Sequence, residues 1–299
     1  REGGREGEGG EEEGAMEAMF SSRVGFAEVG AGRVSLSSLA TRKRHPSNHP
    51  SSMSKREYIS PQGLRIDGRR PGEIRRIQCS LGIFSHADGS ALLEQGNTKV
   101  IASVYGPREA KRRSDQVHDR AFVTCEYTIT SFATSERKRR SKSDRRLREA
   151  GLALKQIFEA IICTHLFPRS QISLFVQVVQ SDGGDLAAAV NACTLALIDA
   201  GIPMQDFLTA CTVGFFDATP VLDMNYTEGN ASGPELIAAV VPKAKKLSYL
   251  QMANKLPIQH LEAMCDAAVE GCRLIYEQLK KKVQIHSYSL LHARGTEPS

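Results

Sequence analysis

The chain has 299 residues and a mass of 32.7 kDa, with 41% hydrophobic residues, 24% charged residues and a formal net charge of +5. These values are typical of a globular protein with enough chain to bury a core, and they exclude a largely disordered chain, a collagen-like chain and a disulfide-stapled miniprotein. No apolar run approaches the roughly 18 residues that cross a bilayer, so we expect no membrane partner. The seven cysteines lie in apolar surroundings without a CxxC pair, which favours buried reduced thiols and an intracellular compartment.

Residues 1–52 differ in composition from the rest of the chain. They open with the Gly/Glu tract REGGREGEGGEEEG and continue through a stretch rich in Ser, Arg, His and Pro. Such a segment buries too little apolar surface to offset its ordering entropy, so we predict a disordered leader. Because Met53 begins the globular pattern, we interpret the leader as a translated extension or a gene-model artefact. We predict one domain over residues 53–299.

The first part of this domain is predicted to be β-rich. Turn signals such as Asp88-Gly89 separate segments of strand character, and these segments cover residues 74–84, 91–94, 98–105 and 122–130. We therefore expect a meander of antiparallel strands over residues 74–130.

The second part mixes helices and strands. Apolar spacing predicts helices from the N-cap Asp144 to about His165, from Asp185 to Ala200 with Gly201 after it, and over about 257–283;. Alternation predicts strands over residues 171–180, 211–217, 220–224, 236–241 and 247–251. This order is typical of an α+β fold with a split βαβ unit at its centre.

Two basic clusters flank one predicted strand. Residues 137–148 read RKRRSKSDRRLR, with eight basic side chains and one Asp in twelve positions, and a second cluster lies upstream. A single cluster of this kind is more often a solvated loop, but two together favour a nucleic-acid path. The candidate RNA-binding residues are Lys111, Arg112, Arg113, Arg137, Lys138, Arg139, Arg140, Arg145 and Arg146.

Two further places carry candidate chemistry. The turn Ser181–Gly184 joins a buried strand to a helix N-terminus, where free amides and the helix dipole favour an anion. Asp223 follows a predicted strand and could act as a general acid. The alternatives are a tight chain reversal for the turn and a turn-forming side chain for Asp223. Periodicity alone does not bring these elements together.

Several long segments resemble the ribonuclease PH superfamily. They are GLRIDGRRPGEIRRI (63–77), ADGSALLEQGNTKVIASVYGPRE (87–109), PRSQISLFVQVVQSDGG (168–184), LALIDAGIPMQD (195–206) and PVLDMNY (220–226). Within this superfamily they are similar to the exosome ring subunits related to the archaeal phosphorolytic subunit, over about residues 55–285. The resemblance implies a ribonuclease PH-type α+β fold (ribosomal S5 domain 2-like), with mixed or antiparallel sheets packed against about four helices.

The same resemblance implies partners and a location. The expected partners are single-stranded RNA, other ribonuclease PH-like subunits in a six-membered ring, S1/KH cap subunits and a separate hydrolytic exoribonuclease. The expected role is 3′→5′ RNA processing and degradation, including rRNA maturation and mRNA turnover, in the nucleus, nucleolus and cytoplasm.

Family activity implies roles for particular residues. Active members use inorganic phosphate, without a cofactor, to cleave the 3′-terminal phosphodiester. By resemblance, Arg146 and the Gly183-Gly184 turn belong to the phosphate site, and Asp223 is the general acid, with Gly229 at a second acidic position. The family motif after the strand reads GGTR, whereas this chain reads Gly183-Gly184-Asp185-Leu186.

This substitution decides the functional hypothesis. A guanidinium that could hold phosphate through two hydrogen bonds is lost, and Asp185 is expected to cap the helix. A phosphate–Asp contact at about 5 Å costs about 3 kcal/mol per unit charge at an effective dielectric of about 20. We therefore predict a non-catalytic structural and RNA-channel subunit in which Asp223 is vestigial and phosphate is not used. The alternatives are an active phosphate-dependent 3′→5′ exoribonuclease that releases nucleoside diphosphates, and a free-standing RNA-binding protein.

Overall fold

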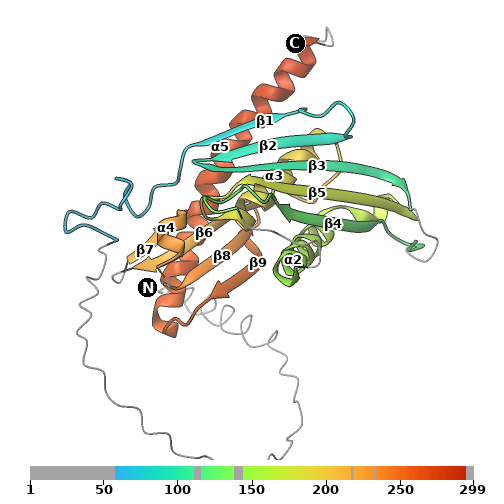
Figure 1. The fold of residues 1–299 in the computed structure, drawn as a ribbon. Helices are drawn as coiled ribbons and strands as arrows, with labels where there is room; N and C mark the ends of the chain where they lie inside the picture. The colour runs from blue at the N-terminus through green and yellow to red at the C-terminus, as the bar shows by residue number, and fades with distance from the viewer. Residues whose placement is uncertain (1–57, 111–115, 138–143, 217–218, 232, 294–299) are drawn as a thin grey trace, which may run out of the picture. The chain divides into compact units, whose positions relative to one another are not determined.

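Two β-sheets and the helices that pack on them make up the fold (Figure 1). The computed structural model describes residues 58–110, 116–137, 144–216, 219–231 and 233–293. The first sheet has the order β1-β2-β3-β5-β4 and the second has the order β7-β6-β8-β9. The strands are β1 Ile77–Leu81, β2 Gly89–Gln95, β3 Thr98–Glu109, β4 Phe122–Ile129, β5 Ser170–Gln180, β6 Thr209–Phe216, β7 Thr219–Leu222, β8 Glu235–Val241 and β9 Lys246–Ala253.

The predicted antiparallel meander holds only for β1, β2 and β3. Strand β5 lies between β3 and β4, and β4 pairs with β5 in parallel, so the prediction of one meander over residues 74–130 was wrong. Strand β5 is buried at Ile172, Leu174, Val176 and Val178, so it takes a central place in the sheet. The resulting sheet is mixed, as the resemblance implied.

The helices are α2 Arg145–Ile161, α3 Asp185–Asp199, α4 Tyr226–Gly229 and α5 Leu261–Ala293, with 3₁₀ turns at Thr164–Leu166 and Ile258–His260. Asp144 caps α2 as predicted, since its side chain accepts a hydrogen bond from the Arg146 amide. The short helix α4 was not predicted. Its signal in the sequence is the pair Asn225 and Glu228, which form a reciprocal capping box;.

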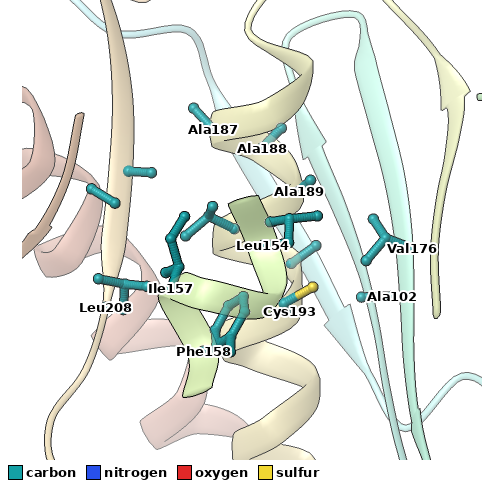
Figure 2. Close-up of a cluster of buried hydrophobic side chains, with 14 of the residues drawn as sticks. Ala102, Leu154, Ile157, Phe158, Val176, Ala187, Ala188, Ala189, Cys193 and Leu208 are labelled. Atoms are coloured by element: carbon teal, nitrogen blue, oxygen red, sulfur yellow. The ribbon is translucent and has the colours of Figure 1, made fainter. Parts of the chain in front are cut away.

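Helix α3 packs against both sheets and occupies the centre of the core. Every residue from Ala187 to Leu197 is buried. Small side chains on α3 let the neighbouring strands approach closely. Figure 2 shows Ile157 and Phe158 of α2 in the same core. A buried amide fixes α3 to the second sheet, because Asn191 both donates to and accepts from the backbone of Ala210.

Helix α5 packs against the second sheet from the opposite face. Its buried side chains recur at helical spacing from Met264 to Leu279;. The Thr209 hydroxyl of β6 donates to the Cys272 carbonyl oxygen at 3.1 Å. The helix continues ten residues beyond the predicted end near 283, to Ala293. The extension contains no Gly or Pro that would end a helix. The prediction ended too early because the buried apolar side chains that define the periodicity end at Leu279.

We expect the packing of α2 into the core to be a main source of stability. Phe158 is fully buried at 0% exposure, so Phe158→Ala should lower the free energy of unfolding by about 3–5 kcal/mol. Leu152 lies on the same helix at 58% exposure, so Leu152→Ala should cost less than about 1 kcal/mol. Urea denaturation followed by circular dichroism measures both values. Equal losses in the two variants would contradict this account of the core.

Candidate functional site

The turn between β5 and α3 is held by two glycines in left-handed conformations. Gly183 and Gly184 have φ angles of +84° and +69°, a region that side chains disfavour. A Cβ at Gly183 would also lie 2.7 Å from the Met224 carbonyl oxygen. The turn therefore places the N-terminus of α3 directly against the segment that follows β7, so Gly183 and Asp223 can belong to one site.

Asp185 is the first residue of α3, and it does not cap the helix. The N-cap is Gly184, which provides no side-chain hydrogen bond. The Asp185 carboxylate instead accepts a hydrogen bond from the Ser181 hydroxyl at 2.6 Å. The expectation that Asp185 caps α3 was wrong, because the left-handed Gly184 takes the capping position one residue earlier. Its negative charge nevertheless lies in the first helical turn, at the positive end of the dipole.

A second carboxylate lies near Asp185. Glu235 begins β8 and pairs with Gly214 of β6. Burial raises the pKa of the Glu235 carboxyl, and the charge of Asp185 raises it further. Nothing in the local sequence distinguishes Glu235, since no local pattern indicates that β8 begins beside α3. Two acidic side chains, Asp185 of α3 and Glu235 of β8, therefore lie near the N-terminus of α3.

Asp223 lies at the end of β7 in a buried ion pair with Arg75. The Arg75 guanidinium donates to both carboxylate oxygens, at 2.7 and 3.0 Å, and the Arg75 backbone amide donates at 2.8 Å. The side chain of Asp223 is only 1% exposed. Asp223 also has a φ of +53° and donates its amide to the Thr212 carbonyl oxygen at 2.7 Å. The carboxylate is therefore fixed from several directions.

The same guanidinium reaches the Gly-Gly turn. Arg75 donates to the carbonyl oxygens of Asp182 at 2.8 Å and Gly183 at 3.1 Å, and to the Thr98 hydroxyl at 3.2 Å. It therefore brings Asp223 and Gly183, two of the predicted site residues, to the same place. Arg75 itself was missed, since in the run GEIRRI it is indistinguishable from a solvated basic residue.

Opposing effects set the pKa of Asp223. Burial alone would raise the pKa of its carboxyl, but the hydrogen bonds and charge of Arg75 more than offset burial, and the pKa lies below its ordinary value. The pKa of Arg75 is raised, because its contacts with Asp223 outweigh a burial effect that would lower it. Asp223 is therefore ionised at neutral pH.

A second buried ion pair lies beside the first. Arg65 donates to both carboxylate oxygens of Glu228, and also to the carbonyl oxygens of Leu222 and Asp223. Both side chains are essentially unexposed. Gly229, the residue at the family's second acidic position, ends α4 next to this pair. The segment around residue 65 is thereby anchored to the strand end that carries Asp223.

The predicted basic residues are only partly within the described chain. Arg137, Arg145 and Arg146 are exposed, and Arg145 pairs with Glu149 at 2.6 Å. Across the described ranges, no hydrogen bond or ion pair joins the Arg146 guanidinium to the Gly183-Gly184 turn. The remaining candidates, Lys111, Arg112, Arg113, Lys138, Arg139 and Arg140, lie outside the described residues.

The described part of the chain offers no metal site and no membrane-spanning helix. There, no helix has the length and apolar character to span a membrane, and no group of three His, Cys, Asp or Glu side chains could hold a metal ion. All seven cysteines are free thiols. Burial raises the pKa of Cys193 and Cys211 well above the ordinary value, so these thiols are poor nucleophiles at neutral pH.

Family comparison agrees with this architecture. Residues 73–203 match the model of the 3′ exoribonuclease family, domain 1, and residues 206–271 match that of domain 2. Together the matches cover more than half of the chain. The chain therefore belongs to the ribonuclease PH family of 3′ exoribonucleases.

The similar curated proteins belong to one group within this family. The exosome complex component RRP41 homolog of Arabidopsis thaliana is 48% identical over 240 residues, covering 80% of this chain and 99% of the relative. RRP41 of Mus musculus is 50% identical, covering 77% of this chain and 94% of the relative. SKI6 of Saccharomyces cerevisiae is 38% identical, covering 79% and 96%.

Solved structures confirm the ribonuclease PH-type α+β fold. Rrp46 of rice (Oryza sativa) superposes with a TM-score of 0.66 at 24% identity, covering 74% of this chain and 100% of the neighbour. A chain of the Archaeoglobus fulgidus exosome with RNA bound to the active site superposes with a TM-score of 0.63 at 19% identity, covering 73% and 93%. At these identities the likeness concerns the fold alone.

The lowered pKa of Asp223 predicts how stability depends on pH. The ion pair with Arg75 stabilises the fold fully above the unfolded carboxyl pKa of about 3.9, and this contribution is lost as the pH falls through the lower folded pKa. Asp223→Asn should cost about 3–5 kcal/mol at pH 7, because it leaves Arg75 buried without its counter-charge. The wild-type advantage should therefore shrink as the pH falls below about 4 in urea titrations.

Glu270→Gln is the control for this measurement. Glu270 forms an exposed ion pair with Arg273 on α5, and such pairs contribute little. We expect no measurable change in unfolding at pH 7. A gap between wild type and Asp223→Asn that stays constant down to pH 3 would contradict the assigned ionisation of Asp223.

Proposed function

We propose that this chain is a ring subunit of an RNA exosome that contributes structure and an RNA path but no phosphorolytic chemistry. Family membership supports the assignment, as do the exosome complex components whose nearly full length this chain matches. The proposed partners are other ribonuclease PH-like subunits, single-stranded RNA, an S1/KH cap and a separate hydrolytic exoribonuclease. The proposed locations are the nucleus, the nucleolus and the cytoplasm.

One observation carries the non-catalytic part of the proposal. The Asp185 carboxylate lies in the first turn of α3 and accepts a hydrogen bond from Ser181, and burial together with this charge raises the pKa of the nearby Glu235. A phosphate entering this turn would meet a like charge where the family motif supplies a guanidinium. At about 5 Å and an effective dielectric of about 20, that contact costs about 3 kcal/mol per unit charge. Phosphate binding is therefore opposed before chemistry begins.

The state of Asp223 supports the same conclusion. A general acid must hold a proton that it can give to the leaving oxygen. Asp223 is ionised at neutral pH and accepts three hydrogen bonds from Arg75. Arg75 is in turn committed to Asp223, to two carbonyl oxygens of the turn and to Thr98. Neither side chain is free to serve a bound phosphate, and we propose that the chain uses neither phosphate nor a cofactor.

The alternative is an active phosphate-dependent 3′→5′ exoribonuclease. It is favoured by Arg146, whose exposed guanidinium makes no hydrogen bond or ion pair with the described residues. For this alternative to hold, Arg146 and a further basic group would have to overcome the repulsion from Asp185. A repulsion of about 3 kcal/mol per unit charge between Asp185 and phosphate disfavours phosphorolysis.

Turnover of RNA distinguishes the two functions. The assembled ring is incubated with 3′-labelled RNA in the presence and absence of inorganic phosphate, and nucleoside diphosphates are quantified. We expect no phosphate-dependent release, because the charge of Asp185 repels phosphate at the start of α3;. Asp185→Thr combined with Leu186→Arg removes the repulsion and restores the guanidinium, so it should raise phosphate-dependent release above the background.

The matched control is Asp185→Asn with Leu186 retained. It removes the charge without adding a guanidinium and should restore less release than the double variant. Phosphate-dependent release from the wild-type ring that disappears in Asp223→Asn, with the ring still intact by light scattering, would sink the non-catalytic proposal and support the alternative.

A separate measurement tests the RNA path. Changing Arg112, Arg113, Arg145 and Arg146 to Gln should weaken RNA binding irrespective of sequence, because phosphate contacts carry no base information. Each lost contact should flatten the slope of log K against log salt by about 0.7 for a single strand. Equivalent changes at Arg273, Lys280, Lys281 and Lys282 on α5 form the control. An unchanged slope in the first variant would remove these residues from the path.

A further inference from the structure

An open cleft lies between helix α5, residues 204–207 of the loop that joins α3 to β6, and Lys243 of the turn that joins β8 to β9. It has a volume of about 360 Å³. Helix α5 lines it with four side chains that recur at successive turns and therefore share one face, namely Tyr276, Lys280, Val283 and Gln284. No residue of the buried ion pairs or of the Gly-Gly turn lines this space. We call it the α5 cleft.

Part of the lining is apolar and firmly placed. Met204, Phe207 and Val283 line the α5 cleft and pack against the hydrophobic core, yet each is only half-buried. The loop that carries the first two is held in place, because the Gln205 amide donates to the Ile161 carbonyl oxygen at 2.9 Å. The cleft therefore exists before a ligand arrives, which lowers the entropic cost of binding.

Two aromatic rings in the lining contact each other edge to face. The ring centroids of Phe207 and Tyr276 lie 5.3 Å apart, with an angle of 73° between the ring planes. The Lys280 ammonium lies over the Tyr276 ring, 5.9 Å from its centroid. The two rings therefore present no parallel faces on which successive bases of a single strand would stack. The apolar lining suits an aliphatic or aromatic side chain instead.

The charges at the α5 cleft are mostly positive. Asp206 is the one acidic side chain among the described residues that line it, and this carboxylate lies 3.5 Å from the Lys243 ammonium. Lys280 lines the cleft as well, and it forms no ion pair with the described residues. Lys245 and Lys246 follow Lys243 closely in the chain and are exposed. A ligand of negative charge is therefore favoured.

Charge and apolar lining together select the occupant. Lysines attract phosphates and carboxylates alike, but a base that entered the α5 cleft would meet aromatic rings already packed against each other. Gln205 and Gln284 also line the cleft, and each amide has donors and an acceptor for a peptide backbone. An acidic peptide that carries a large apolar side chain matches the lysines, the amides and the apolar lining at once.

We propose that the α5 cleft docks an acidic segment of a partner protein. A large apolar side chain of the segment contacts Met204, Phe207 and Val283, and its carboxylates pair with Lys243 and Lys280. The inference goes beyond the proposed function and does not depend on it, because docking of this kind needs neither phosphate, RNA nor a ring. It gives the chain a peptide-binding site of its own.

Fluorescence anisotropy with the full chain tests the inference. The probe is a fluorescein-labelled peptide in which glutamates flank a central leucine–phenylalanine pair. One control peptide has glutamine in place of every glutamate, and another has serine in place of the leucine and the phenylalanine. We expect the probe to bind with a Kd at least about tenfold lower than either control. Equal binding of the probe and the serine peptide, or no binding of the probe, would overturn the proposal.

Charge reversal tests the role of the lysines. Lys243→Glu combined with Lys280→Glu should raise the Kd of the probe at least about tenfold, because carboxylates would then face carboxylates. The matched control, Lys255→Glu combined with Lys281→Glu, makes the same change in net charge at exposed residues that do not line the α5 cleft. It should leave the Kd nearly unchanged. Equal losses in the two variants would reduce binding to general attraction and contradict a docking site.

Filling the α5 cleft tests the apolar contact without a change in charge. Gln284 is exposed and lines the cleft, so Gln284→Trp should occupy the space of the apolar side chain and raise the Kd of the probe at least about tenfold. Gln278→Trp adds the same ring at an exposed position of α5 that does not line the cleft, and it should bind as wild type does. Both changes are at the surface, so the melting temperature should stay close to that of wild type.

Two further measurements separate the α5 cleft from RNA binding and from ring assembly. Gln284→Trp should bind a fluorescein-labelled oligouridylate as wild type does, and it should still assemble with ribonuclease PH-like subunits by light scattering. Loss of RNA binding or of assembly in this variant would assign the cleft to the RNA path or to a ring contact and overturn the proposal. If wild type forms no ring but binds the probe at the cleft, the proposed function fails and the docking inference stands.

Discussion

The buried contact between Arg75 and Asp223 holds together segments that are far apart in the sequence. A single guanidinium joins the residues before β1, the hairpin between β2 and β3, the turn before α3 and the end of β7. Burying a charge is costly unless it is fully paired, and here each partner satisfies the other. Arg65 and Glu228 form a second buried ion pair at the same end of β7. The position of the Gly-Gly turn therefore depends on ion pairs, and any anion would have to compete with them.

This arrangement would retain the fold in a chain without phosphate chemistry, as we propose for this one. The ion pairs that shape the turn do not include residues 185 and 186, so an acidic residue at position 185 leaves the scaffold intact. Asp185 finds a local hydrogen-bond donor in Ser181 and a favourable dipole at the start of α3;. The same carboxylate opposes an incoming phosphate. In the proposed function, a change that is compatible with folding therefore disfavours binding of the family's co-substrate.

Local signals in the sequence predicted much of the fold. Asp144 and Gly201 mark helix ends because capping depends on nearby backbone, and the alternation of residues 171–180 marks a buried strand. Insertion of β5 beside β4 was missed, since strand order depends on contacts between distant segments. Asp223 and Gly183 were singled out as site residues, and they do lie together. Arg75 and Glu235 were missed because burial, which gives them their importance, leaves no local pattern in a charged residue.

The two sides of the second sheet suggest how such a subunit divides its surface. Near the start of α3, Arg75 and Asp223 are buried as an ion pair, while burial and the charge of Asp185 raise the pKa of Glu235. Along β9, the reverse holds: apolar side chains that would belong to a core are left exposed, together with an unpaired backbone edge. Burying that apolar surface stabilises an assembly by about 25 cal/mol for each Å² removed from water. If the pocket does not accept phosphate, as we propose, then contacts with neighbouring proteins and RNA are what the fold supplies.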